Sequence, residues 1–255
     1  MRPLIGLNTS LVDMAEPLKA KAVCHVHYID AVAGAGGVPV ILPPYTDRTM
    51  LDEALAKLDG FCLIGGPDYD PAHYGGHAQP PDQVMHARRQ SFDLWLAEAL
   101  LERTRKPVLG ICGGHQCLSI ARGGALVQDL KTEWRPSGAA APTLLHAGDE
   151  RKGTSQEENA FRHEITLAPG SLIAGIVGRT SVMANSFHHQ AVMPDRLGQG
   201  LVATGWAPDG VVEALELPGE RFVLGVQWHP ERLTHELEHR LIFGALVGAA
   251  GRGRN

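Results

Sequence analysis

The chain has 255 residues, with 23 Lys and Arg against 28 Asp and Glu, so its formal net charge is −5. At 44% hydrophobic and 20% charged residues, the composition is that of a globular protein and excludes a disordered, collagen-like or coiled-coil chain. The mildly acidic balance includes no long run of Lys and Arg, so neither a nucleic acid nor a membrane surface is expected as a partner. The length fits either one α/β domain or two smaller domains.

The cysteines and the N-terminus bear on the cellular compartment. Four cysteines are too few and too unevenly spaced for a disulfide scaffold or a paired zinc site, so we interpret them as reduced thiols. The apolar stretch at the N-terminus is too short for the core of a signal peptide, and no run reaches the roughly eighteen apolar residues of a membrane span. These features predict a cytoplasmic protein.

The first half alternates short aliphatic runs with longer amphipathic segments, which is typical of parallel strands joined by crossover helices. Helices are expected just before the Gly-rich stretches and between the aliphatic runs. The expected strands are Leu4–Asn8, Val38–Leu42, Phe61–Ile64 and Val108–Ile111, and the expected helices are 20–34, 48–58, 84–105 and a fourth from just after Cys112 to Gly123-Gly124.

The second half has short strands separated by turn residues, which predicts antiparallel hairpins at the edge of the same sheet. These strands are Val182–Asn185, Leu201–Gly205, Val211–Leu217 and Phe222–Gln227, followed by a closing helix at 234–248. Residues 131–160 have no periodicity and predict a long loop. Such a loop is either a lid over a functional site, on the side where a leaving group would depart, or a surface insertion. We therefore expect one domain over 1–250, a three-layer α/β fold with a mostly parallel central sheet, and a flexible tail at 251–255.

The sharpest motif is Gly110-Ile111-Cys112-Gly113-Gly114-His115-Gln116, which follows an apolar run and precedes a predicted helix. It has the pattern of a nucleophile elbow with Cys in place of Ser. The flanking glycines permit a tight strand-to-helix turn, and the helix N-terminus offers free amides and partial positive charge to a thiolate. A Gly-rich turn with a buried, inert Cys is the alternative.

A base for this thiol must come from a distant part of the chain. The segment Gly225-Val226-Gln227-Trp228-His229-Pro230-Glu231 offers one at the end of an apolar strand. His229 can take the thiol proton, and Glu231 can hold the imidazole and stabilise its positive charge. Alone, His-Pro-Glu at a strand end is more often an ordinary turn, but together with the elbow it predicts a Cys-His-Glu triad.

These two motifs resemble the class I glutamine amidotransferase fold, a flavodoxin-like α/β fold with a Cys-His-Glu acyl-transfer site. Further segments are similar to the γ-glutamyl-γ-aminobutyrate hydrolase branch, known as peptidase C26, and the resemblance runs from about residue 3 to 246. The segments are Gly65-Gly66 with Asp70-Pro71 and Tyr74-Gly75, Gly123 to Leu130, His163, Asn185-Ser186-Phe187-His188-His189-Gln190-Ala191-Val192, and Asp209-Gly210-Val211-Val212-Glu213-Ala214.

The resemblance implies hydrolysis of a small-molecule γ-glutamyl amide through a γ-glutamyl thioester, with no metal and no organic cofactor. It assigns Cys112, His229 and Glu231 to catalysis and the amides of Gly66 and Gly113 to the oxyanion hole. It places Gln116, Asn185, Ser186 and His188 near the substrate. The oligomeric state is left open, with a homodimer among the alternatives.

Two departures from the branch leave the leaving group undetermined. Members of the branch usually carry Arg directly after the nucleophile, whereas Gly113-Gly114-His115-Gln116 resembles biosynthetic glutaminase subunits. The usual Arg-Asp pair in the preceding helix appears as Arg89-Gln90. The alternative functions are therefore a glutaminase subunit that delivers ammonia to a separate synthetase and, less in keeping with an intact triad, a binding protein without activity.

Other chemistry-bearing residues favour structural roles. Cys24-His25-Val26-His27 could be a metal cluster, but it falls on a predicted helix where Cys24 and His27 share a face and His25 points away. Cys117 is expected in the core. The 13 histidines show no spacing typical of a zinc site.

Overall fold

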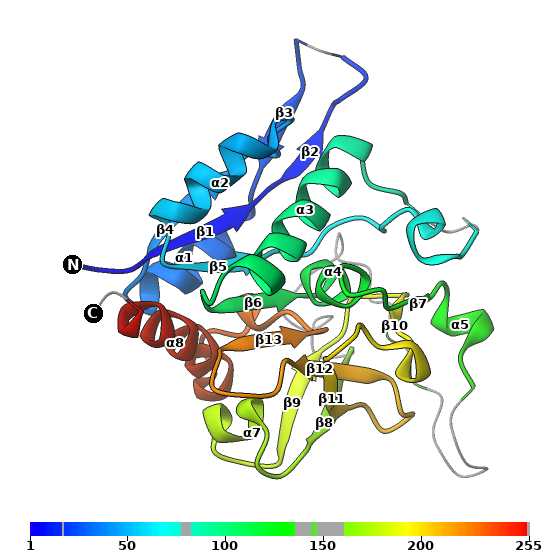
Figure 1. The fold of residues 1–255 in the computed structure, drawn as a ribbon. Coiled ribbons are helices and arrows are strands. Elements are labelled where there is room, and N and C mark those ends of the chain that lie inside the picture. Colours follow the sequence, from blue (N-terminus) through cyan, green and yellow to red (C-terminus); the bar gives the residue numbers. More distant parts are fainter. Residues whose placement is uncertain (17, 78–82, 136–143, 145, 147–160, 254–255) are drawn as a thin grey trace.

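The computed structural model describes residues 1–16, 18–77, 83–135, 144, 146 and 161–253. Within them, a nine-stranded mixed sheet in the order β4-β1-β5-β6-β13-β12-β11-β8-β9 is covered by helices on both faces (Figure 1). None of the described helices is long and apolar enough to cross a membrane. The expected α/β fold is confirmed.

One half of the sheet is parallel. Apart from the partly exposed edge strand β4, its strands are buried on both faces, which is why they read as continuous aliphatic runs in the sequence. In sheet order they are β4 (Val38–Leu42), β1 (Leu4–Asn8), β5 (Gly60–Leu63), β6 (Val108–Ile111) and β13 (Val223–Val226). Their bounds agree with the predicted ones to within one residue. β13 forms the predicted antiparallel hairpin with β12 and also pairs parallel with β6, so it joins the two halves of the sheet.

The other half is antiparallel, as the turn-rich second half of the sequence predicts. It consists of β12 (Val212–Glu216), β11 (Val202–Trp206), β8 (Arg162–Leu167) and β9 (Ser181–Asn185). The sequence analysis missed β8 and the short helix α7 (Leu172–Val177) that follows it. Two small ribbons pair β10 (Ala191–Val192) with β7 (Leu126–Val127) and β2 (Ser10–Val12) with β3 (Lys21–Val23).

Each face of the sheet has its own hydrophobic core. On one face, α1 (Val26–Gly34), α7 and α8 (Leu237–Arg252) cover residues such as Ile5, Ile111 and Val226. On the other face, α2 (Arg48–Lys57), α3 (Ala87–Arg103) and α4 (Gly113–Ile120) cover a second core that includes Leu63 and, as expected, Cys117. The structure thus has the three layers expected.

Three expectations differ from the structure. The helix expected at 20–34 begins only at Val26, because Lys21–Val23 pairs with Ser10–Val12 in the β2-β3 ribbon. Of the expected loop at 131–160, the first residues form the short helix α5 (Leu130–Glu133), whereas 136–143, 145 and 147–160 lie outside the described residues. Helix α8 continues through Arg252, so the expected tail at 251–255 starts as helix.

Glycines allow α4 to approach β5 and β6 more closely than any side chain would permit. A Cβ at Gly114 would lie 2.1 Å from the carbonyl oxygen of Leu63, and one at Gly110 would lie 2.6 Å from the carbonyl oxygen of Gly114. Both contacts are with backbone, which cannot rotate away. The glycines of the elbow motif therefore set the distance between the helix and the sheet.

We predict opposite effects on stability for two Gly→Ala substitutions in helices. Gly114→Ala forces α4 away from β5 and should cost about 1–3 kcal/mol of unfolding free energy. Gly244→Ala, in α8 with no atom within 4 Å of the added methyl group, should gain about 0.5–1 kcal/mol from helix propensity. Urea denaturation measures both, and equal stability of the two variants would contradict the close approach.

Candidate active site

Three neighbouring parallel strands end at the same edge of the sheet and bring the candidate site together. β5 leads into Gly65 and Gly66, β6 leads into Cys112, and β13 leads, three residues further on, to His229. Because β5, β6 and β13 are adjacent and parallel, their carboxyl ends lie side by side. A Cβ at Gly65 would lie 3.2 Å from Cε1 of His229 and 3.3 Å from Cβ of Cys112, so the three segments are in contact.

Cys112 occupies a strained turn between β6 and α4. Its φ of 51° and ψ of −107° are unusual for a residue with a side chain, and it directly precedes the first residue of the helix. Its amide donates to the carbonyl oxygen of Val226 at 2.8 Å, which fixes the turn against β13. The elbow expected from the sequence is present, with the thiol aimed at the edge where His229 lies.

His229 contacts Cys112 on one side and Glu231 on the other. Its Nδ1 lies 2.7 Å from Oε1 of Glu231, and the Cys112 side chain lies on the other side of the imidazole, next to Gly65. Burial disfavours the charged imidazole, but the Glu231 carboxylate and a thiolate at Cys112 outweigh burial and raise the pKa of His229 well above its ordinary value. This imidazole is able to accept and hold the proton of the Cys112 thiol.

The other three thiols are in different surroundings. Burial raises the pKa of Cys24 to about 11 and also raises the pKa values of Cys62 and Cys117, both fully buried. These three thiols stay protonated at neutral pH and are poor nucleophiles. Cys112 alone among the four cysteines has a histidine base in contact.

Gly66 and Gly113 face each other beside the thiol. A Cβ at Gly113 would lie 3.3 Å from the amide nitrogen of Gly66. Gly113 is the first residue of α4, and the first amides of a helix have no partner inside it. The two glycine segments are thus close enough for both backbone amides to donate to one oxygen, which is the arrangement that an oxyanion hole requires.

The buried ion pair of Arg89 and Asp93 contacts the Gly65-Gly66 turn. Nε of Arg89 lies 3.1 Å from Oδ2 of Asp93, and each side chain is 1% exposed. Arg89 also donates from Nη2 to the carbonyl oxygen of Gly65 at 2.9 Å. A Cβ at Gly66 would lie 2.0 Å from Nη1 of Arg89, so only glycine fits there. Arg89 therefore pairs one turn further along α3, not with its neighbour Gln90.

Two further side chains hold the same turn, Asn8 from β1 and Tyr28 from α1. Asn8 accepts from the amide of Ile64 at 2.7 Å and donates to Asp93 at 2.8 Å, so it connects β1 to α3. The hydroxyl of Tyr28 accepts from the amide of Gly65 at 3.1 Å. The sequence analysis missed Asn8 and Tyr28, because neither lies in a motif and only the fold brings them to the turn.

Asn185 and Gln116, expected near the substrate, form hydrogen bonds with protein groups around the thiol. Asn185 accepts from the amide of His229 at 2.9 Å and donates to its carbonyl oxygen at 3.2 Å, which fixes the backbone of the base. Gln116 donates to the carbonyl oxygen of Gln190 at 3.2 Å and to the side chain of Gln227 at 3.3 Å. Both residues therefore position the segments that surround the thiol.

Ser186 and His188, also expected near the substrate, lie in a buried polar cluster. Ser186 donates to the carbonyl oxygen of His146 at 3.0 Å, and Nε2 of His188 lies 3.4 Å from Oε1 of Glu213. His163 also contacts Glu213. These histidines have no zinc-like spacing in the sequence, because they come from separate segments. Of the described His, Cys, Asp and Glu residues, His146, His163 and Glu213 form a compact group, whereas Cys24, His25 and His27 form none.

The family model described as Peptidase C26 matches residues 3–231 of the chain. A protein of Mycobacterium tuberculosis, provisionally named as a glutamine amidotransferase, is 35% identical over 98% of this chain and 75% of its own length. The γ-glutamyl-γ-aminobutyrate hydrolase of Escherichia coli is 32% identical over 87% of this chain and 84% of its own length.

The fold also matches a solved structure. The glutaminase domain of a CTPS from Trypanosoma brucei, with bound acivicin, superposes with a TM-score of 0.64 over 98% of this chain and 94% of that domain. The sequence identity is 16%, so the match concerns the fold alone.

We predict that, because the backbone at Cys112 is strained, a glycine at this position gives an unfolding free energy equal to or higher than an alanine does. A positive φ costs about 1–3 kcal/mol for a residue with a side chain, whereas the lost burial of the methyl group costs about 0.8 kcal/mol. Cys112→Gly should therefore equal or exceed Cys112→Ala in unfolding free energy. Ala97→Gly, in buried α3, is the matched control and should lose stability. A loss at Cys112 as large as at Ala97 would argue against strain.

Proposed function

Because the chain belongs to the peptidase C26 family, we propose that it hydrolyses γ-glutamyl amides through a thioester on Cys112, with the γ-glutamyl derivative of an amine such as γ-aminobutyrate as substrate. The observation that carries the proposal is the contact of His229 with Cys112 on one side and with Glu231, at 2.7 Å, on the other. The hydrolase relative from Escherichia coli supports the choice of bond. The four free cysteines fit a reducing, cytoplasmic environment.

In the first half of the reaction, His229 takes the proton of the Cys112 thiol, and the thiolate attacks the γ-carbonyl carbon. The amides of Gly66 and Gly113 donate to the oxygen as it becomes an oxyanion, and each such donor contributes about 3–4 kcal/mol to lowering the barrier. His229 then gives its proton to the amine nitrogen. The C–N bond breaks, the amine leaves, and the γ-glutamyl group remains as a thioester on Cys112.

In the second half, His229 removes a proton from water, and the resulting hydroxide attacks the thioester carbonyl. The C–S bond breaks, glutamate leaves, and the proton held by His229 returns to the Cys112 sulfur. Glu231 stabilises the imidazolium in both halves. Asn185 keeps the imidazole in line through its two hydrogen bonds to the backbone of His229.

Delivery of ammonia from glutamine to a separate synthetase is the second candidate function. The provisional name of the Mycobacterium tuberculosis relative favours it, as does Gly113 in place of the branch's usual Arg after the nucleophile. Both functions use the same thioester chemistry and differ in the leaving group and in the need for a partner.

We predict that the purified chain releases amines from a panel of γ-glutamyl amides, with no partner protein added, faster than it releases ammonia from free glutamine. Steady-state rates per active site measure the preference, and Cys112→Ala supplies the background. Ammonia release from glutamine as the faster reaction would favour the glutaminase role. No turnover of any γ-glutamyl amide or of glutamine would contradict the proposal.

We predict that substitutions of the three triad residues reduce kcat by different amounts. His229→Ala removes the group that moves the proton and should reduce kcat by about as much as Cys112→Ala. Glu231→Gln keeps a hydrogen-bond acceptor for Nδ1 but removes the charge, so we expect a smaller loss, roughly 10²–10⁴-fold. Thioester formation and breakdown can be followed in single-turnover experiments. A larger loss for Glu231→Gln than for His229→Ala would contradict these roles.

A further inference from the structure

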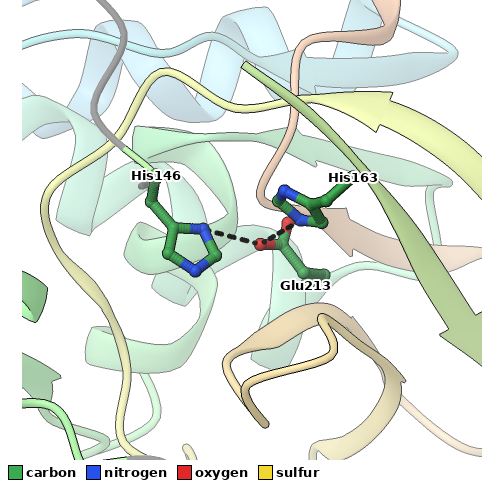
Figure 2. A group of neighbouring side chains, drawn as sticks. All are labelled: His146, His163 and Glu213. Carbon is green, nitrogen blue, oxygen red and sulfur yellow. Dashed lines mark ion pairs between the residues drawn. The ribbon is translucent and has the colours of Figure 1, made fainter. Parts of the chain in front are cut away.

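Three histidines surround one buried carboxylate apart from the catalytic triad. His163 lies in β8 and Glu213 in β12, whereas His146 and His188 lie in segments between strands. Figure 2 shows the rings of His146 and His163 facing the carboxylate of Glu213. Glu213 is 0% exposed and no described histidine of the group exceeds 8%. The reaction proposed above uses none of these side chains.

The distances within this cluster fit metal ligands better than hydrogen bonds. Oε1 of Glu213 lies 3.5 Å from Nδ1 of His146, 3.3 Å from Nε2 of His163 and 3.4 Å from Nε2 of His188. Charge-assisted N–H···O hydrogen bonds are about 2.7–2.9 Å long. Ligand atoms about 2.0–2.1 Å from a tetrahedral zinc ion are separated by about 3.3–3.4 Å. The three separations match the edges of such a tetrahedron.

The proton positions leave unprotonated ring nitrogens near the carboxylate. Nε2 of His146 lies 3.0 Å from Oδ2 of Asp209, so the neutral ring carries its proton on Nε2. Ser186 donates its hydroxyl proton to the carbonyl oxygen of His146 and has none for Nδ1. Nδ1 is then the unprotonated nitrogen, and it lies 3.2 Å from Oγ of Ser186 and 3.5 Å from Oε1 of Glu213. A ligand histidine whose other nitrogen donates to a carboxylate is the usual arrangement at metal sites.

His188 repeats this pattern. Its Nδ1 lies 2.9 Å from the carbonyl oxygen of Gln190, which places the proton of the neutral ring on Nδ1 and the lone pair on Nε2, toward Glu213. Two unprotonated imidazole nitrogens and a carboxylate oxygen thus lie near one another.

The charge of Glu213 needs a counter-ion at this depth. Neither carboxylate oxygen makes a hydrogen bond of normal geometry within the described residues. A buried carboxylate without a hydrogen-bond partner or a counter-charge is strongly unfavourable. A metal ion or protons on the imidazoles would offset this cost.

We propose that His146 Nδ1, His163 Nε2 and Glu213 Oε1 bind a divalent transition-metal ion, with Zn²⁺ as the best fit. His188 lies outside this compact group, but its Nε2 is 3.4 Å from Oε1 of Glu213, so a small movement of the ring would bring it in as the fourth donor. The three ligand atoms lie within 4.8 Å of one another, and a bound ion would draw them inward. Three imidazoles and one carboxylate suit Zn²⁺ and its neighbours in the first transition row, whereas Ca²⁺ and Mg²⁺ require oxygen ligands.

The metal has a structural role in this proposal. The cluster is closed to solvent, which is typical of structural zinc sites, and its ligands join β8, β12 and the segment that follows β9. Asn185, three residues before His188, fixes the backbone of His229. Metal binding would therefore stabilise the fold and the placement of the catalytic base without touching the substrate.

The first test is metal analysis of the full chain, purified without a polyhistidine tag and without chelators. We expect about one equivalent of zinc or a neighbouring transition metal per chain, and less than about 0.1 equivalent in Glu213→Gln. The double variant His25→Ala/His27→Ala is the matched control, because it removes exposed histidines elsewhere and should keep the metal. A Glu213→Gln protein that retains its metal would overturn the proposal.

The second test uses the wild-type chain, so that it does not depend on whether a variant folds. After dialysis against a chelator, Co²⁺ should give the intense visible absorption of a tetrahedral site, and Zn²⁺ should remove that absorption and raise Tm. A chain with no metal as purified, no Co²⁺ spectrum and an unchanged Tm would show that protons, not a metal, balance Glu213. None of these readouts uses a substrate, so they are independent of the outcome for γ-glutamyl amides.

Discussion

The adjacency of β5, β6 and β13 is the constraint on which the candidate site depends. Neighbouring strands lie about 4.8 Å apart, so residues that follow their carboxyl ends are held at contact distance by the backbone hydrogen bonds of the sheet. Gly66, Cys112 and His229 come from three such ends and are far apart in the sequence. The sheet, and not any local motif, converts them into one site.

The side chains around this edge of the sheet are polar but buried, so ion pairs and hydrogen bonds must replace the hydration that they lose. Arg89 and Asp93 are almost completely buried, and their charges are matched by each other and by hydrogen bonds from Asn8 and to Gly65. Removing one member would leave the other charge uncompensated, at a cost of about 3–5 kcal/mol. This network holds the Gly65-Gly66 turn in one position, and donors held in fixed positions are what electrostatic stabilisation of a transition state requires.

One short segment connects the catalytic base to the histidine cluster. Asn185 binds the backbone of His229, and Ser186 and His188 contact the residues around Glu213. The segment resembles the γ-glutamyl-γ-aminobutyrate hydrolase branch, which suggested contact with the substrate. In the structure these side chains are directed into the protein, so their contribution to the reaction would be to hold the base and the strands around it.

The sequence by itself determined the three-layer α/β fold, the parallel strands and the elbow, because each depends on local signals: aliphatic runs, helical periodicity and glycines on both sides of a cysteine. It also singled out His229 and Glu231, which are two residues apart. Only the tertiary structure decided that β13 joins the parallel half, that β8 exists and that Asn8 and Tyr28 support the oxyanion turn. It alone grouped His146, His163 and Glu213, because contacts between distant segments depend on strand pairing and leave no spacing in the sequence.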